Sequence, residues 1–306
     1  MDDDLKQILN TESQINKKVD AKNKEEILKE YDGKDKIVKA KQIYQNMKAS
    51  GIDEVRFGVK TGFKLIDQAL TNPYKNAKGI MSEDLCIITG HTGNGKTTLI
   101  STLRRNILRQ GHYSMLFSFE NSIESIVRTW KPNDPNMSDY IDFYCPQNID
   151  ETDGQWLKDR MLEGVLKYPH INVIFIDHLD YIYDVERGQS EEQAIRNTVR
   201  FLTVFARKHH VIIFLIAHPS NKVEEEREVQ LNHLKGSSSI KQFASQVLVV
   251  NKDEFNNSTL KLKKNRWAGR IESVEMKYIP ETDMLVEKGK VKMIKESKIN
   301  FGSNEI

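Results

Sequence analysis

Cysteine is scarce in this sequence, with only Cys86 and Cys145 among 306 residues. Both lie inside apolar runs and neither has neighbours at metal-ligand spacing, so we expect two buried free thiols and a reducing compartment. Long apolar runs are missing as well, since none approaches the roughly 18 residues of a membrane span. The opening MDDDLKQILN is acidic and polar, unlike a signal or transit peptide. These features predict a soluble cytoplasmic protein with no membrane partner.

A large net charge is also lacking. The 46 lysine and arginine residues nearly balance the 44 aspartate and glutamate residues, which leaves a formal net charge of +2. Average composition therefore neither favours nor excludes a nucleic-acid partner, and any basic binding surface must be local. A chain of this length can bury a sizeable core as one large domain or two small ones.

Composition divides the chain into three regions. Residues 1–57 are polar, with sparse apolar positions at broken helical spacing. They predict weak helices in an arm that is either a solvated tail or a segment that docks on a partner. Residues 58–288 alternate apolar runs with amphipathic stretches, as a folded domain does. Residues 289–306 are basic and then polar, and we expect a flexible tail.

The region 58–288 has the pattern of an α/β domain. Its short apolar runs, each expected as a buried strand, are DLCIITG, SMLFSFE, IDFYCPQ, NVIFIDHLD, VIIFLIAH and QVLVVNK. Helical patterns occur at 96–110, 151–167, 190–208 and 237–244. Such strands separated by helices predict a mostly parallel sheet covered on both faces. After Asn251 the strand-like runs are closely spaced, which predicts antiparallel strands at one edge of the sheet.

The stretch GHTGNGKTT, residues 90–98, follows an apolar run and precedes a helical pattern. It fits G-x-x-x-x-G-K-[ST] in the strand-to-helix context that a phosphate-binding loop requires. Lys96 would reach the β- and γ-phosphates and Thr97 would ligate Mg²⁺, while the glycines let backbone N–H groups point at the phosphates. The sequence thus predicts that ATP, or another NTP or dNTP, is bound with Mg²⁺ by Gly90, Thr92, Gly93, Asn94, Gly95, Lys96, Thr97 and Thr98.

Three other apolar runs end in polar side chains that the same chemistry needs. Asp177 is the expected second Mg²⁺ ligand, and the alternative is that it only caps the end of its strand. Asp180 is a weaker candidate for the same ligand role. Glu120 is the expected base that orients water, and the alternative is a solvated acid. His218 is expected to sense the γ-phosphate unless its role is structural. Because the carboxyl ends of parallel strands share one edge, these groups should converge on Lys96.

Seven motifs also occur in the order and spacing of one known family: GVKTGFKLIDQAL, GHTGNGKTT, SFEN, FIDHLD, AHPSNK, LKGSSSIKQFASQVLVV and KKNRWAG. Over about residues 55–288 the chain resembles the RecA-like hexameric replicative DNA helicases, the DnaB-like superfamily 4 with its phage and Twinkle-type members. The resemblance implies a RecA-like P-loop NTPase fold. It also implies an ATP-dependent DNA helicase that hydrolyses nucleotide at the subunit interfaces of a ring and moves 5′–3′ on single-stranded DNA during replication.

The resemblance assigns roles to three residues near the C-terminal strands. Arg266 matches the arginine finger, which reaches the nucleotide of the neighbouring subunit and stabilises transition-state charge. Lys264 resembles its companion, and Gln242 resembles a further γ-phosphate sensor. Without the resemblance, LKLKKNR would be read as the solvated face of an edge strand.

Two loops resemble those that line the central channel and grip single-stranded DNA. Asn221, Lys222, Lys235 and Gly236 fall at the matching positions. A lysine and a few N–H groups per subunit, repeated around a ring, would follow phosphates without reading sequence. The acidic EEER beside Lys222 repels phosphate, so we expect only the first part of that loop to face DNA.

The chain departs from the family at two points. A short polar segment stands where members usually carry a scaffold, primase or zinc-binding domain, which counts against priming and against ring formation without help from a primase, polymerase or loader. Residues 22–48 are the candidate for the family's linker helix. The segment between the second and third strands is also short, and together these departures predict a trimmed motor of viral or mobile-element origin.

Two other functions stay open at this point. A RecA/RadA-type strand-exchange protein or a KaiC-like ATPase would share the same fold and nucleotide loop. A non-unwinding, ATP-gated accessory module of a replication or defence complex would bind nucleotide without needing turnover. The intact set of Lys96, Glu120, Asp177 and Arg266 argues against such a module, because a switch can lose the base or the finger.

Overall fold

The computed structural model describes the residues 40–49, 57–72, 77–122, 124–126, 143–144, 154–183, 185, 187–220, 228–253 and 257–288. The chain divides into two units, Met1–Val55 and Arg56–Ile306. In the first unit the described element is helix α3 (Ala40–Ala49). The predicted linker helix at 22–48 is therefore described only from residue 40 onward, and the tail 289–306 lies outside the described residues. None of the described helices is both long and apolar enough to cross a membrane.

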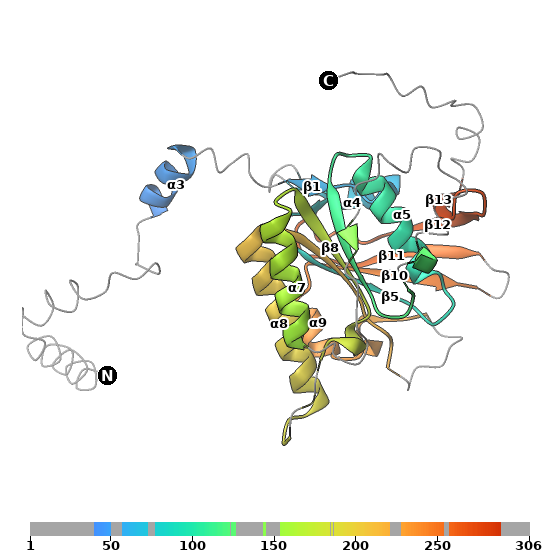
Figure 1. Cartoon of the computed structure of the whole chain (residues 1–306). Coiled ribbons are helices and arrows are strands. Elements are labelled where there is room, and N and C mark those ends of the chain that lie inside the picture. Colours follow the sequence, from blue (N-terminus) through green and yellow to red (C-terminus); the bar gives the residue numbers. More distant parts are fainter. Residues whose placement is uncertain are drawn as a thin grey trace, which may run out of the picture. The chain divides into compact units, whose positions relative to one another are not determined.

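The second unit is built on one nine-stranded sheet of order β13-β12-β11-β10-β5-β9-β8-β6-β7 (Figure 1). Its parallel strands are β5 (Leu85–Thr89), β6 (Tyr113–Ser118), β7 (Phe143–Tyr144), β8 (Ile171–Asp177), β9 (Ile212–Ile216) and β10 (Gln246–Lys252). The antiparallel strands are β11 (Ser258–Asn265), β12 (Glu272–Ile279) and β13 (Met284–Glu287). The mostly parallel sheet and its antiparallel edge are therefore confirmed.

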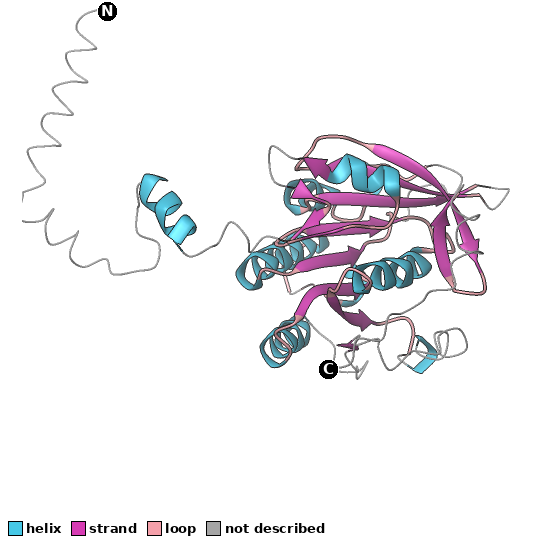
Figure 2. Cartoon of the chain, turned by 90° about the horizontal axis from the view of Figure 1, so that it is seen from above, coloured by secondary structure: helices cyan, strands magenta, loops and turns pink. Residues whose placement is uncertain are grey.

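Helices cover both faces of this sheet, as Figures 1 and 2 show. One face packs against α7 (Gly154–Lys167), α8 (Glu191–His209) and α9 (Ser237–Phe243), and the other against α4 (Lys64–Leu70) and α5 (Lys96–Leu108). The central strands are apolar on both sides because each face meets helices: in β9, Ile213 and Leu215 enter the first core while Ile212, Phe214 and Ile216 enter the second. The four predicted helical patterns all occur as helices.

Shorter elements complete the described fold. The two-residue strands β1 (Gly58–Val59) and β4 (Ile80–Met81) pair with each other, as do β2 (Thr71–Asn72) and β3 (Ala77–Lys78). Two 3₁₀ turns, η5 (Leu179–Tyr181) and η6 (Leu231–His233), follow β8 and precede α9. Helix α8 starts at a serine cap, because the Ser190 side chain accepts a hydrogen bond from the Gln193 N–H.

The two cysteines have different outcomes. Cys86 is a buried free thiol in β5, as expected, and burial raises its pKa well above the usual value. Cys145 lies outside the described residues.

Strand direction defines two opposite edges of the sheet. We call the edge at which β5, β6, β8 and β9 end the carboxyl edge, and the opposite one the amino edge. At the carboxyl edge Ser118 of β6 lies level with Asp177 of β8. At the amino edge Gln246, the first residue of β10, is level with Cys86 of β5 on one side and with Asn265, the last residue of β11, on the other. The residues that follow β5 therefore lie at the carboxyl edge, whereas those that follow β11 lie at the amino edge.

Candidate active site

The loop 90–95 joins β5 to α5 at the carboxyl edge and has the backbone of a phosphate cradle. Gly90, Gly93 and Gly95 have φ angles of 155°, 80° and 88°, which favour glycine. A Cβ on Gly90 would lie 2.2 Å from the Val250 carbonyl oxygen. A Cβ on Gly93 or Gly95 would have no described atom within 4 Å. The positive φ angles therefore explain why glycine occupies these two positions, and the space beside them is open to a ligand.

Lys96 begins α5 and turns back over the cradle. Its Nζ donates hydrogen bonds to the carbonyl oxygens of Gly90 at 3.0 Å and His91 at 3.1 Å. Burial lowers the pKa of Lys96, whereas the charges of Asp177 and Glu120 raise it. The ammonium group therefore lies in the loop that it is expected to serve, and both candidate carboxylates act on it.

The carboxylate of Asp177 is 2% exposed at the end of β8. A pocket of about 120 Å³ opens beside it, lined by Thr97, Thr98, Ile100, Ser101, Leu116, Ser118, Asn121, Ser125, Ile126, Asp177 and Asp283. Hydroxyl and carboxylate oxygens of this kind are the ligands that Mg²⁺ takes alongside phosphate. The open glycine cradle and this oxygen-lined pocket together fit a nucleotide phosphate chain with its metal ion.

His178 is a site residue that the sequence reasoning missed. Its Nε2 lies 2.8 Å from Asp177 Oδ1 and 3.0 Å from Glu120 Oε2, and its side chain is 2% exposed. Burial lowers the pKa of His178, but the nearby Asp177 and Glu120 outweigh it, so the pKa is raised overall. The sequence signal that could have identified His178 is its place directly after Asp177, at the end of an apolar run. Its contact with Glu120 arises only because β6 pairs with β8.

His218, after β9, lies at the same edge. Its ring stacks on that of His178 with centroids 4.2 Å apart and an interplanar angle of 13°. Burial and the charges of His178 and Lys96 lower its pKa. The structure therefore brings Lys96, Glu120, Asp177 and His218 to one edge, as the strand-end rule predicts.

Lys235 has ion-pair partners within its own chain. Its Nζ lies 2.9 Å from Asp180 Oδ1 and 2.8 Å from Glu191 Oε1, and 5.3 Å from the centre of the Tyr183 ring. Burial lowers the pKa of Lys235, but hydrogen bonds with Glu191, Tyr183 and Asp180 raise it well above the usual value. Asp180, the rival metal ligand, is thus engaged with Lys235.

Gly236 caps the start of α9 with a φ of 67°, and a Cβ there would lie 2.3 Å from a methyl carbon of Ile195. Its glycine identity therefore has a structural explanation. The other two predicted DNA contacts, Asn221 and Lys222, lie outside the described residues.

Arg266, Lys264 and Gln242 lie together at the amino edge, away from Lys96. Arg266 Nη2 donates to the carbonyl oxygen of Gln242 at 2.6 Å, and the Lys264 ammonium donates to that of Lys241. Burial and the charge of Arg266 lower the pKa of Lys264 to about 8. The structure does not bring these three residues to the phosphate cradle of their own chain.

The turn that carries Arg266 is anchored from inside the fold. Trp267 Nε1 donates to Asp84 at 2.8 Å and 3.0 Å, and Gln246 Nε2 donates to the same carboxylate at 2.8 Å. Burial raises the pKa of Asp84, although these donors oppose the shift. Arg266 is exposed on a backbone that is held in place.

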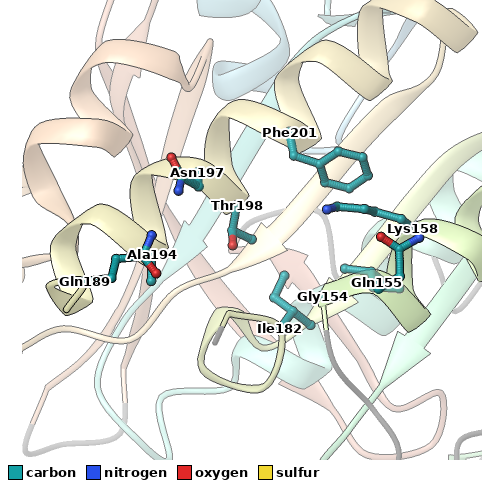
Figure 3. Close-up of a pocket in the computed structure, with 10 residues that line it drawn as sticks. Gly154, Gln155, Lys158, Ile182, Gln189, Ala194, Asn197, Thr198 and Phe201 are labelled. Atoms are coloured by element: carbon teal, nitrogen blue, oxygen red, sulfur yellow. The ribbon is translucent and has the colours of Figure 1, made fainter. Parts of the chain in front are cut away.

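A further pocket of about 370 Å³ lies between α7 and α8 (Figure 3). It is lined by Gly154, Gln155, Leu157, Lys158, Ile182, Gln189, Ala194, Asn197, Thr198 and Phe201, and Lys158 Nζ lies 5.2 Å from the centre of the Phe201 ring. None of the predicted site residues lines this pocket. It is thus separate from the phosphate cradle.

The sequence and the fold both have relatives. The family model for the DnaB-like helicase C terminal domain matches residues 149–287. A "Probable replicative DNA helicase" from Trieres chinensis is 24% identical over 244 residues, which is 71% of this chain and 52% of that protein. The chain therefore spans about half the length of this curated relative.

Two solved structures share the fold. The first, described as an ATPase domain, has a TM-score of 0.61 at 15% identity, covering 83% of this chain and 99% of that one. A DnaB-like replicative helicase, described with its interactions with primase, has a TM-score of 0.58 at 16% identity, covering 92% of this chain and 76% of that one. The RecA-like fold predicted from the sequence is confirmed.

Proposed function

Because the family model for the DnaB-like helicase C terminal domain matches residues 149–287, we propose that this protein is an ATP-dependent DNA helicase motor. It would form a ring, hydrolyse nucleotide where two subunits meet, and use the released energy to move along single-stranded DNA during replication. Movement in the 5′–3′ direction is part of the proposal through the family resemblance.

One observation carries this proposal: the residues that we expect to form the two halves of a nucleotide site lie at opposite edges of the sheet. Lys96 and Asp177 are at the carboxyl edge, and Arg266 follows Asn265 at the amino edge. Asn265 is level with Gln246 of β10, which is level with Cys86 of β5. Gly90 lies four residues after Cys86, and four residues of extended strand span about 13 Å along the sheet. One copy cannot join the two halves, whereas copies arranged head to tail around a ring can.

At the carboxyl edge each side chain would have its own task. Lys96 would bind the β- and γ-phosphates in place of the loop carbonyls that it now contacts. Glu120 would hold and orient the attacking water, because its carboxylate is 43% exposed at the mouth of the site. Thr97 and Asp177 would hold Mg²⁺, which neutralises phosphate charge when bound.

At the amino edge Arg266 would reach the nucleotide of the next subunit and stabilise the charge that develops on the transferred phosphoryl group. Lys264 would add a second positive charge. The backbone carbonyl oxygen of Gln242 accepts a hydrogen bond from Arg266. Gln242 would therefore sense the γ-phosphate of the neighbouring subunit's nucleotide as well.

His218 would report the state of the nucleotide to the DNA-binding loops. The carbonyl oxygen of His218 accepts a hydrogen bond from the N–H of Lys235 at 3.3 Å. A change around the γ-phosphate would therefore have a short covalent and hydrogen-bonded route to Lys235 and Gly236, the described members of the proposed DNA contacts. The other two proposed contacts, Asn221 and Lys222, lie between His218 and Lys235 in the sequence.

The proposed partners are further copies of this chain, most simply six in a ring, and single-stranded DNA. A primase, a polymerase or a loader completes the set, and the cytoplasm is the expected location. The primase has support from the solved DnaB-like helicase described with its interactions with primase.

Nucleotide hydrolysis measured with and without single-stranded DNA tests this function. We expect DNA-stimulated turnover that falls by about 1,000-fold in Arg266→Ala, as loss of an arginine finger does. Arg270→Ala is the matched control, because Arg270 is exposed four residues further along the same turn region. Equal turnover of Arg266→Ala and Arg270→Ala would contradict catalysis through Arg266.

A further inference from the structure

Three side chains at the carboxyl edge have the composition of a transition-metal site. Glu120, His178 and His218 each offer one ligand atom, and these atoms all lie within 4.8 Å of one another. We propose that they bind a divalent transition metal of the Zn²⁺ type, at a position separate from that of Mg²⁺.

The ligand types decide which metal fits. Two imidazoles and one carboxylate suit Zn²⁺ and similar ions, whereas Mg²⁺ takes oxygen ligands almost exclusively. The Mg²⁺ ligands of the proposed motor, Thr97 and Asp177, are not among these three residues. The same edge thus holds one set of oxygen ligands and one set dominated by nitrogen.

The two imidazoles are already held in place. His178 is 2% exposed, and its Nε2 lies 2.8 Å from the buried Asp177 carboxylate. The ring of His218 is stacked against it at 4.2 Å. The contact with Asp177 and the stacking together fix the orientation of both rings. Little side-chain freedom remains to be lost when a metal binds.

Glu120 gives the site an opening. Its side chain is 43% exposed, while that of His178 at 3.0 Å is buried. A metal ion can therefore enter from the solvent side, with one coordination position left for water, as in three-ligand zinc sites.

Metal binding here has a consequence that rests on the proposed function. A carboxylate that ligates Zn²⁺ can no longer orient a water molecule for attack on the γ-phosphate. Zn²⁺ would therefore inhibit hydrolysis even with Mg²⁺ in excess. The metal binding itself does not depend on the protein being a helicase.

Direct metal binding tests the proposal. Zn²⁺ is titrated into the full chain in competition with a chromogenic chelator, and Co²⁺ is used as a spectroscopic probe because its visible absorption reports four-coordinate nitrogen and oxygen ligands. We expect one equivalent bound per chain. Affinity should fall at least about tenfold in each of His178→Ala, His218→Ala and Glu120→Gln.

His210→Ala is the matched control, because His210 forms a solvent-exposed pair with Glu83 and should leave affinity unchanged. If His178→Ala fails to fold, His218→Ala and Glu120→Gln still decide, since both positions are less buried. Unchanged Zn²⁺ affinity in His218→Ala and Glu120→Gln, or the absence of any one-equivalent binding, would overturn the proposal.

Turnover with Mg²⁺ alone separates this inference from the motor function. DNA-stimulated hydrolysis without Zn²⁺ tests the motor, and the binding titration tests the metal site. When both hold, inhibition should follow the fractional Zn²⁺ occupancy measured by titration. Zn²⁺ binding without such inhibition would support the metal site but contradict the proposed loss of Glu120 as the residue that orients water.

Discussion

Lys96 and Arg266 lie at opposite edges of one sheet, although a single strand, β10, separates the strands that precede them. Lys96 follows β5, and Arg266 follows β11, which is antiparallel to the intervening β10. Their side chains bind to backbone carbonyl groups of different elements, the cradle in one case and the end of α9 in the other. In the proposed motor, each residue would therefore complete a nucleotide site only with another copy of the chain.

Mixing two inactive variants tests this arrangement. Arg266→Ala keeps an intact cradle and Lys96→Ala keeps an intact finger, so an interface that takes the cradle from the first and the finger from the second is complete. With random mixing, roughly a quarter of the interfaces are complete. We expect up to about that share of the wild-type hydrolysis rate, measured after the subunits have exchanged.

The control for this mixture is a single chain that carries both substitutions, mixed with either single variant. No interface can then combine an intact cradle with an intact finger, and activity should stay at the level of the variants alone. Shared catalysis is excluded if the two single variants, shown to be in the same rings, give no recovery.

Glu120→Gln tests the proposed base. The amide keeps the size of the side chain but cannot accept a proton, so kcat should fall by about 100-fold or more while the KM for nucleotide changes little. Glu124→Gln is the control, because Glu124 is an exposed acid four residues further along. A kcat within a few-fold of wild type in Glu120→Gln would assign the base elsewhere.

The pH dependence of turnover reports on Lys264. Burial and the charge of Arg266 lower its pKa to about 8, so the ammonium is present below that pH and is lost above it. We expect kcat/KM, which reflects the free enzyme, to decline above about pH 8. In Lys264→Arg the charge persists, and the alkaline decline should weaken. Lys263→Arg, on the neighbouring position of β11, should leave the profile as in the wild type.

Much of the fold was predictable because burial on both sides leaves a clear pattern. β5, β8, β9 and β10 are continuous apolar runs, and GHTGNGKTT requires a strand before it and a helix after it. The strand-end rule then placed Glu120, Asp177 and His218 on one edge without any knowledge of strand order.

Contacts that depend on strand order and direction were not predictable. The contact of His178 with Glu120 arises because β6 neighbours β8, and its stacking on His218 because β8 neighbours β9. Periodicity contains no signal for these pairings. The salt bridges of Lys235 with Asp180 and Glu191 likewise join residues about 45 to 55 positions apart. Nothing in the sequence around Lys235 indicates these partners, so the sequence predicted a lysine available to bind DNA phosphate.

Trp267→Phe should destabilise the fold. The substitution removes an N–H donor from Asp84, which is 1% exposed, and a buried carboxylate that loses a partner costs about 1–3 kcal/mol. Urea unfolding of the two proteins measures the difference. Tyr278→Phe is the control, because it removes a hydrogen bond to Asp283 from a side chain that is 46% exposed, and it should change stability by less than about 0.5 kcal/mol.

The final prediction concerns Lys235, whose ammonium group is shared by two carboxylates. A DNA phosphate can bind it only in competition with Asp180 and Glu191. Lys235→Gln should weaken single-stranded DNA binding and reduce the slope of log affinity against log salt by about 0.7 per bound subunit. Asp180→Asn and Glu191→Gln should act in the opposite direction and tighten binding, because each removes one competitor from the lysine.

DNA affinity is measured over a series of salt concentrations, without turnover, so that any effect of Asp180→Asn on catalysis does not enter. Lys261→Gln is the control, since Lys261 pairs with Glu228 at 2.8 Å on β11 and has no proposed DNA contact. If Lys235→Gln leaves both affinity and salt slope unchanged while lowering the free energy of unfolding, Lys235 serves to fasten α9 to α8 and η5. The phosphate contacts of this loop would then have to come from backbone N–H groups, whose binding has a much weaker dependence on salt.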